Sequence, residues 1–228
     1  MMAAKPAPIP DIEPAHLRLL REHRQEVIDA YHELLYERQS IMWLGHNLLK
    51  SPLDLWVYQE MINVIRPELI VEFGTWKGGS ALYYAQLCEL LNHGVVVTVD
   101  INAWAAAPKH DRLCYLTGDS TSDQMIKLVH EISKVYGVVM VILDSDHHKP
   151  HVLKELDAYW DVVTPGSFLV VEDTNVNGHP VYPSFGPGPH EAVQEWIKTE
   201  NGQHFYIDRG CERFLISSHQ GGYLRRVK

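Results

Sequence analysis

Residues 69–79 read LIVEFGTWKGG, an apolar run that passes directly into a glycine-rich turn. Glycines at Gly74 and Gly78 let the backbone approach a ligand, and the helix expected after them directs its first amide groups at an anionic group. The turn departs from the Gly-x-Gly-x-x-Gly pattern of dinucleotide sites because Glu72 stands at the first glycine. Its carboxylate is able to bind an ammonium group, which favours an amino-acid-bearing cofactor over a dinucleotide. The candidate cofactor-binding residues of this stretch are Glu72, Gly74, Thr75, Gly78, Gly79 and Ser80.

From residue 68 onward, short apolar runs alternate with stretches of helical spacing, as is typical of a parallel sheet covered on both faces. The expected strands are Leu69–Phe73, Val95–Val99, Leu113–Thr117, Val138–Leu143 and Ser167–Val171, with a closing pair at His204–Ile207 and Arg213–Ser217. The expected helices are Ser80–Leu91, Ser122–Tyr136, Pro150–Val162 and His190–Thr199. The closing pair is joined by Asp208-Arg209-Gly210, too short for a crossover helix, so the last strand should run antiparallel. The sequence thus predicts an α/β fold with a Rossmann-like, doubly wound sheet of seven strands.

The N-terminal part of the chain has a different pattern. Apolar residues recur at helical spacing from Pro14 to Gln39, which indicates an amphipathic helix. Packing or contact between subunits is the favoured role of this helix, so a homo-oligomer is expected, and capping of an active site is the alternative. We expect an N-terminal helical extension over residues 1–45 and a catalytic domain over residues 46–228. Residues 43–56, which span this boundary, resemble a lid at the site entrance.

Acidic residues follow two of the predicted strands. Asp144 comes after Val138–Leu143, and Glu172 and Asp173 come after Val171. If the two strands are neighbours, their carboxyl ends emerge about 5 Å apart. Carboxylates so close repel one another, and a divalent cation would make them a satisfied site of oxygen ligands. Oxygen ligation suits Mg²⁺, Mn²⁺ or Ca²⁺ better than zinc. The alternative is a set of solvated helix caps.

Two further acidic loops follow strands of the same half of the chain. Asp100 ends the strand Val95–Val99, near the place where such folds bind ribose hydroxyls with a carboxylate. Asp119 and Ser120 follow the third strand and are candidates for hydrogen bonds to an adenine edge. Each of these residues also occurs commonly as a turn or helix cap, and for Asp119 the two interpretations are evenly matched.

Histidines supply a candidate general base. His147 lies three residues after Asp144, and its neutral imidazole accepts a proton near physiological pH. His179 is a second candidate, on the Pro- and Gly-rich segment 175–189, which is long for a plain connector. His147 and His151 also have the i, i+4 spacing of zinc ligands, although isolated pairs of this kind are usually solvated helix ends.

Composition narrows the class of protein. The formal net charge of −9 and the lack of a basic stretch argue against nucleic-acid binding. Three separated cysteines without Cys-x-x-Cys spacing indicate a reducing compartment. We find neither a signal peptide nor an apolar run of membrane-spanning length. These features predict a soluble, cytoplasmic protein that acts on a small molecule.

Taken together, the motifs resemble the cephalosporin hydroxylase family, whose members resemble class I S-adenosylmethionine-dependent O-methyltransferases in fold. The resemblance is carried in order by WLG at 43–45, RPELIVE at 66–72, GGS at 78–80, GDS at 118–120, LDSDH at 143–147, EDT at 172–174, GPGP at 186–189 and GYL at 222–224. It implies that residues 72–79 hold the methionine moiety of S-adenosylmethionine, with Asp100 on the ribose and Asp119 on the adenine side. It also implies that Asp144, which is a candidate cofactor-binding residue as well, ligates Mg²⁺ together with Glu172 and Asp173.

The expected function is a metal-dependent methylation of a hydroxyl on a secondary metabolite, a sugar or a catechol-like diol, in keeping with antibiotic biosynthesis. In catechol-type O-methyltransferases, a lysine three residues after the first metal aspartate removes the proton; here that position holds His147. Three alternatives remain open: a hydroxylase of the kind the family name records, a non-catalytic cofactor-binding partner, and a nicotinamide-dependent oxidoreductase. The missing first glycine counts against the oxidoreductase.

Overall fold

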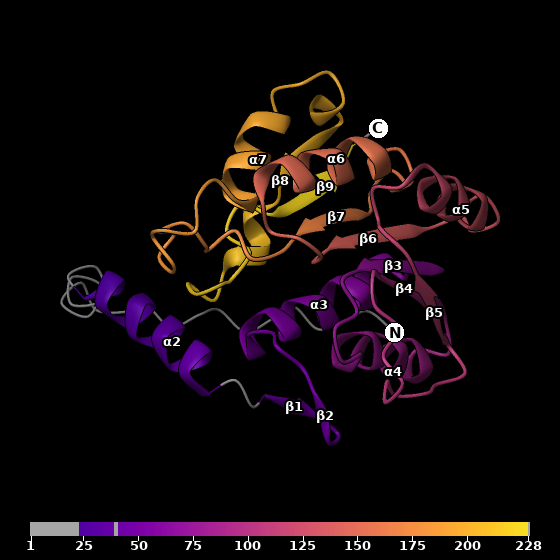
Figure 1. The fold of residues 1–228 in the computed structure, drawn as a ribbon, viewed down its shortest axis with the longest axis horizontal. Coiled ribbons are helices and arrows are strands. Elements are labelled where there is room, and N and C mark those ends of the chain that lie inside the picture. Colours follow the sequence, from indigo (N-terminus) through magenta and orange to yellow (C-terminus); the bar gives the residue numbers. More distant parts are fainter. Residues whose placement is uncertain (1–22, 39–40, 228) are drawn as a thin grey trace, which may run out of the picture.

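A seven-stranded sheet forms the centre of the protein in a computed structural model that describes residues 23–38 and 41–227 (Figure 1). The strand order is β5-β4-β3-β6-β7-β9-β8. The bounds are β3 Leu69–Phe73, β4 Val95–Asp100, β5 Leu113–Thr117, β6 Val139–Leu143, β7 Phe168–Val171, β8 Phe205–Ile207 and β9 Tyr223–Arg226. Only β9 runs antiparallel to its neighbours in this sheet, β7 and β8. The predicted doubly wound α/β sheet of seven strands is confirmed.

Helices cover both faces of the sheet. On one face lie α3 (Pro52–Ile65) and α4 (Gly79–Leu90), and on the other lie α5 (Asp123–Ser133), α6 (Lys149–Tyr159) and α7 (Pro189–Trp196) (Figure 1). Every residue of β3, β6 and β7 is buried. Alternate residues of β3 serve the two cores: Val71 belongs to the cluster under α5, α6 and α7, and Ile70 to the cluster under α3 and α4. Burial on both faces explains why the strands are continuous apolar runs.

The closing pair differs from the prediction in its second strand. Residues 213–217 are not a strand, and the position at the sheet is taken by β9. The chain first makes a 3-10 turn at Arg209–Glu212, and the amide of Ser218 then donates a hydrogen bond to the buried carboxylate of Asp54 on α3 at 2.9 Å. This segment is therefore held by a side chain outside the sheet, which residue spacing does not reveal.

The N-terminal region adds a helix and a short hairpin. Helix α2 (Arg24–Arg38) extends from the side of the sheet-bearing body, and β1 (Met42–Trp43) pairs with β2 (His46–Asn47) (Figure 1). The helix predicted over residues 14–39 is confirmed for Arg24–Arg38; His23 precedes the helix as a bend, and residues 14–22 and 39 lie outside the described ranges. Among the described helices, none has both the length and the apolar character needed to cross a membrane.

Hydrogen bonds hold the carboxyl ends of the central strands side by side. The amide of Asp144 donates to the carbonyl of Phe73 at 2.8 Å, and the amide of Glu172 donates to the carbonyl of Leu143 at 2.9 Å. Gly74 has a φ of +98°, and a Cβ at this position would lie 1.8 Å from the carbonyl oxygen of Asp144. The turn after β3 passes this close to β6 only because Gly74 has no side chain.

Replacement of Gly74 by alanine should therefore destabilise the fold by more than the strain of an alanine at positive φ, because the new Cβ also clashes with the Asp144 carbonyl. We expect Gly74→Ala to lower the free energy of unfolding by well over the cost of Gly166→Ala, which is about 1 to 2 kcal/mol for an alanine at positive φ. Gly166 is the matched control, since it has a φ of +85° and a Cβ added there would have no atom within 4 Å. Urea denaturation of both variants tests this, and equal losses would contradict the close approach.

Candidate active site

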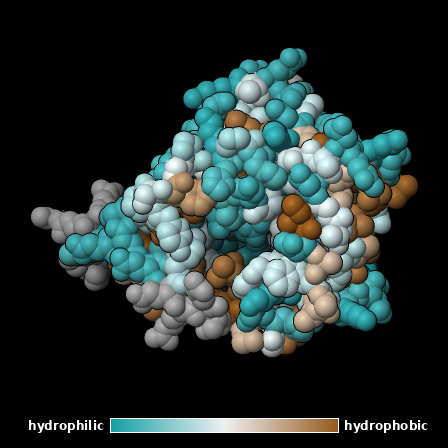
Figure 2. All heavy atoms as spheres, in the orientation of Figure 1, coloured by the Kyte–Doolittle hydropathy of each residue, from teal (hydrophilic) through white to brown (hydrophobic). Residues whose placement is uncertain are grey.

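A cavity of about 650 Å³ opens at the carboxyl ends of the parallel strands. It is lined by the turns after β3, β4, β5 and β6 and by residues 47–50, which follow on from the hairpin. Figure 2 shows a mainly hydrophilic face around a central hollow, with hydrophobic side chains in small patches. The predicted cofactor-binding residues that line this cavity are Gly74, Thr75, Gly79, Ser80, Asp100, Asp119, Ser120 and Asp144. Its position matches the ligand sites of doubly wound sheets, beside the switch in strand order.

Asp100 shapes the glycine-rich turn as well as lining the cavity. One carboxylate oxygen accepts hydrogen bonds from the amides of Thr75 at 3.0 Å and Trp76 at 2.9 Å, and the other accepts from the amide of Asn102 at 2.8 Å. A carboxylate has about four lone-pair positions, so these bonds leave capacity for a ligand hydroxyl. The predicted contact with ribose thus remains available to a side chain that also fixes the turn.

Glu72 and Gly78, in contrast, do not line the cavity. Glu72 is fully buried and accepts a hydrogen bond from the hydroxyl of Thr98 at 2.7 Å. Its Oε1 has no hydrogen-bond partner within the described residues, and burial raises the pKa of Glu72 to about 7. A Cβ on Gly78 would come within 2.9 Å of Pro108 and Tyr115. Both residues lie behind the turn, and the contact of Glu72 with an ammonium group stays a prediction.

Asp119 and Ser120 follow β5 and line the cavity, and Asp119 also stabilises the turn there. The carboxylate of Asp119 accepts hydrogen bonds from both the amide and the hydroxyl of Thr121, which lower the pKa of Asp119. Ser120 Oγ lies 3.1 Å from His151 Nε2. His151 therefore faces Ser120, and the described geometry does not group it with His147 as a pair of metal ligands.

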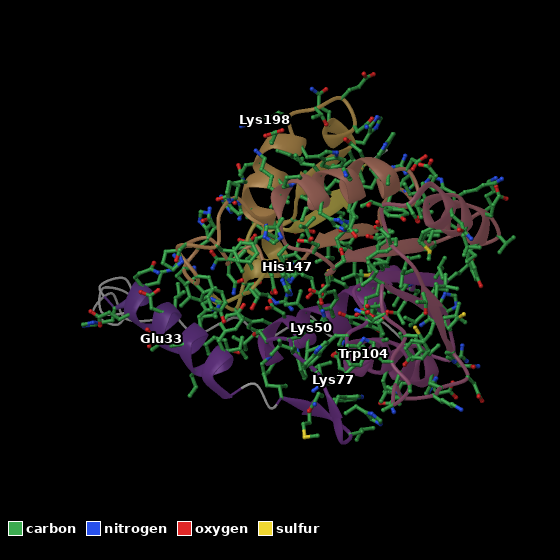
Figure 3. All side chains as sticks on the ribbon, in the orientation of Figure 1. Glu33, Lys50, Lys77, Trp104, His147 and Lys198 are labelled. Carbon is green, nitrogen blue, oxygen red and sulfur yellow. The ribbon has the colours of Figure 1, made fainter. Side chains whose placement is uncertain are left out.

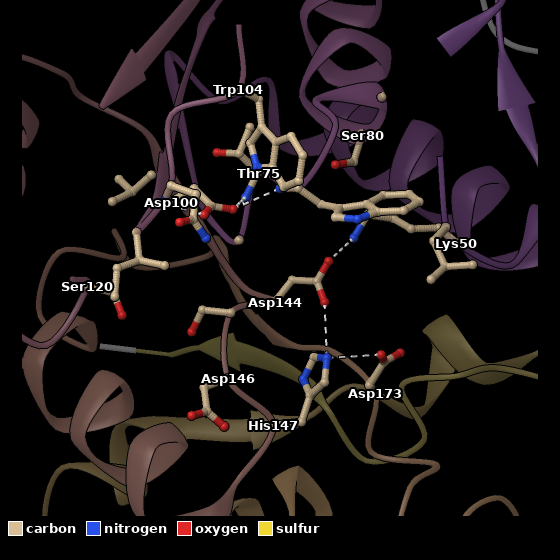
Figure 4. Close-up of a pocket in the computed structure, with 18 of the residues that line it drawn as sticks. Lys50, Thr75, Ser80, Asp100, Trp104, Ser120, Asp144, Asp146, His147 and Asp173 are labelled. Atoms are coloured by element: carbon tan, nitrogen blue, oxygen red, sulfur yellow. Dashed lines mark hydrogen bonds and ion pairs between the residues drawn. The ribbon is translucent and has the colours of Figure 1, made fainter. Parts of the chain in front are cut away.

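Lys50 occupies the place between the two acidic strand ends. Its Nζ lies 2.7 Å from Asp144 Oδ2 and 2.5 Å from Glu172 Oε2 (Figure 4 shows the contact with Asp144). The Lys50 side chain is almost completely buried. Burial by itself would lower the pKa of Lys50, but the two carboxylates raise it well above its usual value. The chain thus provides its own monovalent cation for the acidic pair that sequence reasoning assigned to a metal.

Glu172 is enclosed on its other side. Its Oε1 accepts a hydrogen bond from the hydroxyl of Tyr58 at 2.6 Å, and His219 Nε2 lies 3.5 Å from Oε2. Burial has the largest single effect and would raise the pKa of Glu172, but Lys50, His219 and the hydrogen bond from Tyr58 together outweigh it and hold the pKa below its usual value. The Glu172 side chain is 2 % exposed, so its carboxylate faces the interior and not the cavity.

Asp144, His147 and Asp173 form a second cluster, called the outer cluster below, which opens to the cavity. His147 Nε2 lies 3.2 Å from Asp173 Oδ2 and 3.9 Å from Asp144 Oδ1 (Figure 4). One ligand atom from each of these three residues lies within 4.8 Å of the others. All three are partly exposed, and all three line the cavity. In Figure 3, His147 and Lys50 lie at the centre of the molecule, between the sheet and α2. This cluster is the part of the acidic region that a ligand from solvent reaches first.

His179, the second candidate base, has a different setting. Its Nε2 donates to Glu191 Oε1 on α7 at 2.9 Å, and its ring stacks on His190. Glu191 also accepts hydrogen bonds from the Asn177 side chain and the Gly188 amide, at 3.0 and 2.7 Å. Although partial burial acts in the opposite direction, these bonds hold the pKa of Glu191 at about 2. Glu191 thus fastens the segment 175–189 to α7, and His179 belongs to that clamp.

The clamp predicts a pH dependence with a definite sign. The pKa of Glu191 falls from 4.5 to about 2 on folding, so its stabilising effect is complete above pH 4.5 and is lost as the pH falls toward 2. Partial exposure screens the contacts, so we expect Glu191→Gln to cost about 1 kcal/mol at pH 7. Urea denaturation of both proteins from pH 7 to pH 3 tests this. A cost that stays constant down to pH 3 would contradict the assignment.

Lys50 is a second position for a stability test. Lys50→Met leaves the buried Glu172 and the partly exposed Asp144 without their counter-charge, and breaking a buried ion pair costs about 3 to 5 kcal/mol. We expect a loss of this size at pH 7, partly recovered by millimolar Mg²⁺, because a divalent cation neutralises the same carboxylates. Lys149→Met is a matched control, since the ion pair of Lys149 with Glu195 is partly exposed. A loss no larger than in the control would contradict the role of Lys50.

Sequence reasoning missed Lys50 and His219. Neither residue lies in a motif, and Lys50 is separated from its partner Glu172 by 122 positions in sequence. Tyr58, which donates a hydrogen bond to Glu172, is fully buried. The sequence shows an excess of acidic residues at the strand ends, which indicates that a cation is needed there but does not identify it.

Comparisons with known proteins identify the family of this chain. The family described as rhamnosyl O-methyltransferase/CmcI matches residues 36–227. A rhamnosyl O-methyltransferase from Mycobacterium tuberculosis is 37% identical over 210 residues, which cover 88% of this chain and 85% of the relative. The family resemblance inferred from the motifs is confirmed.

Solved structures agree in fold. An apo structure of CmcI has a TM-score of 0.62 at 21% identity, covering 82% of this chain and 76% of the other. A CmcI structure with magnesium and S-adenosylmethionine has a TM-score of 0.60 at 20% identity, covering 82% and 77%. The family match spans most of the chain, and the mycobacterial relative is 37% identical over 85% of its own length. The chain therefore belongs to the rhamnosyl O-methyltransferase/CmcI family and is an O-methyltransferase.

Proposed function

We propose that this enzyme transfers the methyl group of S-adenosylmethionine to a sugar hydroxyl, with Mg²⁺ bound at the outer acidic cluster. The observation that carries the proposal is the position of Asp144, His147 and Asp173, which together line the cavity formed by the glycine-rich turn. A donor methyl group and an acceptor hydroxyl held there would be neighbours. The sugar acceptor is inferred from the relatives, which are named rhamnosyl O-methyltransferases. Magnesium and S-adenosylmethionine are inferred from the CmcI structure that contains both.

The donor would lie along the turns after β3, β4 and β5. The first amides of α4, which begins at Gly79, would present donors to the carboxylate of the methionine moiety. Asp100 is placed for the ribose hydroxyls, and Asp119 and Ser120 line the far end, where the adenine would lie. Trp104 lines the same cavity and offers an apolar ring face for the base. When bound, the sulfonium supplies an electrophilic methyl group.

Asp144 and Asp173 fit a magnesium ion. In proteins this cation commonly binds through one or two carboxylates and keeps several waters, so two partly exposed acids suffice. Glu172 would act behind them, because Lys50 already neutralises it and fixes Asp144 Oδ2. When bound, a divalent cation makes a coordinated hydroxyl more acidic. The donor set of the outer cluster is thus consistent with the predicted metal, with Glu172 in a supporting role.

His147 is the proposed proton acceptor. It lines the cavity, whereas His179 is engaged with Glu191 on the segment 175–189. Asp173 Oδ2 lies 3.2 Å from His147 Nε2, so the ring is held beside the proposed metal ligands. Residues 47–50 line the cavity, and the segments 43–56 and 175–189 would exclude water from the attacking oxygen.

Metal binding offers a test that needs no acceptor. We expect Asp173→Asn to weaken Mn²⁺ binding, followed by electron paramagnetic resonance, by about tenfold or more, since Asp173 supplies one of few protein ligands. The affinity for S-adenosylhomocysteine should stay unchanged, because the donor lies along the turns after β3, β4 and β5. Asp111→Asn is the control, since Asp111 is exposed and lines neither cavity. Equal Mn²⁺ affinity in wild-type protein and Asp173→Asn would reject the metal site.

Turnover tests the reaction itself. Mass spectrometry should detect a singly methylated product from phenyl α-L-rhamnopyranoside, S-adenosylmethionine and Mg²⁺, and the yield should be the same without oxygen. An oxygen requirement would instead favour the hydroxylase alternative. Methylation of a catechol and not of the rhamnoside would place the enzyme with the catechol-type relatives.

A further inference from the structure

A second cavity lies between α2 and the proline-rich segment 180–183. Its volume is about 780 Å³, within the size range of ligand sites. One wall is the face of α2 that carries Asp29, His32, Glu33 and Tyr36, and the other wall includes Tyr182. Figure 3 labels Glu33 on α2, with His147 nearer the centre of the molecule. Neither α2 nor this cavity has a part in donor or metal binding as derived above.

His32 has a ring nitrogen, Nε2, for which the described residues provide no hydrogen-bond partner. The side chain is fully buried and lines the cavity. Its Nδ1 lies 3.3 Å from the amide nitrogen of Asn175, which has only protons to offer, so Nδ1 is the acceptor in that contact. The remaining proton therefore belongs on Nε2, for which the described residues supply no partner. A buried donor without an acceptor costs free energy, and a ligand oxygen in the cavity would satisfy it.

The rest of the lining selects for neutral, hydroxyl-rich molecules. Asp29 and Glu33 stand one helical turn apart and accept hydrogen bonds from hydroxyl groups. None of the described residues that line the cavity is lysine or arginine, so an anionic ligand would meet only like charge. The rings of Tyr36 and Tyr182 pack edge to face at 5.2 Å and offer apolar surface to the C–H face of a sugar ring.

Asn175 links this cavity to the reaction site. Its side chain contacts both His32 and Tyr36 on α2, and it lies two residues after Asp173. Asp173 and Asp144 also contribute, after burial, to a raised pKa of Tyr36, as expected for a ring close to the acidic cluster. A ligand in the second cavity would therefore reach toward the hydroxyl-activating residues.

We propose that the cavity between α2 and residues 180–183 binds the neutral glycoside portion of the acceptor, with His32 Nε2 and the Glu33 carboxylate as its polar contacts. This inference rests on the proposed sugar O-methyltransferase function and assigns acceptor selection to α2, outside the sheet. Sugar phosphates are excluded by the acidic lining.

Binding without turnover tests the inference. Saturation-transfer NMR with phenyl α-L-rhamnopyranoside, in the presence of S-adenosylhomocysteine, should give a Kd that rises tenfold or more in His32→Leu and severalfold in Glu33→Gln. Leu34→Ala is the matched control, since Leu34 is a neighbour on α2 that is 51% exposed and does not line the cavity. Rhamnose 1-phosphate should not bind. The thermal shift caused by S-adenosylhomocysteine should be the same in all four proteins.

The outcomes separate the two proposals. An unchanged Kd in both cavity variants, or failure of the rhamnoside to bind wild-type protein that does bind S-adenosylhomocysteine, overturns the acceptor cavity and leaves the donor site standing. Failure of wild-type protein to bind S-adenosylhomocysteine overturns the proposed function itself. If His32→Leu does not fold, Glu33→Gln and Tyr182→Ala decide the matter, because both side chains are exposed.

Discussion

The buried contact of Lys50 with Asp144 and Glu172 is the interaction around which this active site is arranged. Parallel strands β6 and β7 bring the two carboxylates together, and the doubly wound topology leaves no alternative position for them. Two buried anions at this separation require a cation. The ammonium of Lys50 provides it at 2.7 and 2.5 Å, and in doing so ties the segment before α3 to the end of the sheet.

This contact divides the acidic region into an inner and an outer part. The inner part, around Glu172, is closed by Tyr58 and His219 and has the character of a core network. The outer part, made by Asp144, His147 and Asp173, opens to the cavity. Because Lys50 holds one oxygen of Asp144, the other is directed outward beside Asp173. A fixed inner charge pair thus orients the side chains that would hold the proposed metal ion.

Hydrogen bonds from distant elements also hold the segment after Asp173. The residue two positions later, Asn175, joins the strand end to α2 through His32 and Tyr36. Glu191 fastens the remainder of that segment to α7. A helix outside the sheet and a proline-rich segment therefore meet over the acidic cluster, each held by buried or partly buried hydrogen bonds. Together they form the wall at which an acceptor would be selected.

Local sequence patterns were enough to predict the parallel strands and the edge of the sheet at which the acidic residues gather. They did not predict which side chain neutralises each carboxylate. Leu69–Phe73 and Val139–Leu143 are continuous apolar runs because both faces of these strands are buried, and Gly74 marks the turn that must pass close to β6. The rules of parallel sheets extend these patterns to the neighbourhood of Asp144 and Asp173. Lys50, in contrast, meets Glu172 across 122 positions of sequence, and His32 meets Asn175 across 143. No periodicity or spacing encodes such contacts, because each arises when a buried polar group finds its partner on a distant element. Packing in three dimensions therefore settled that a lysine neutralises the inner pair and that the outer acids face the cavity.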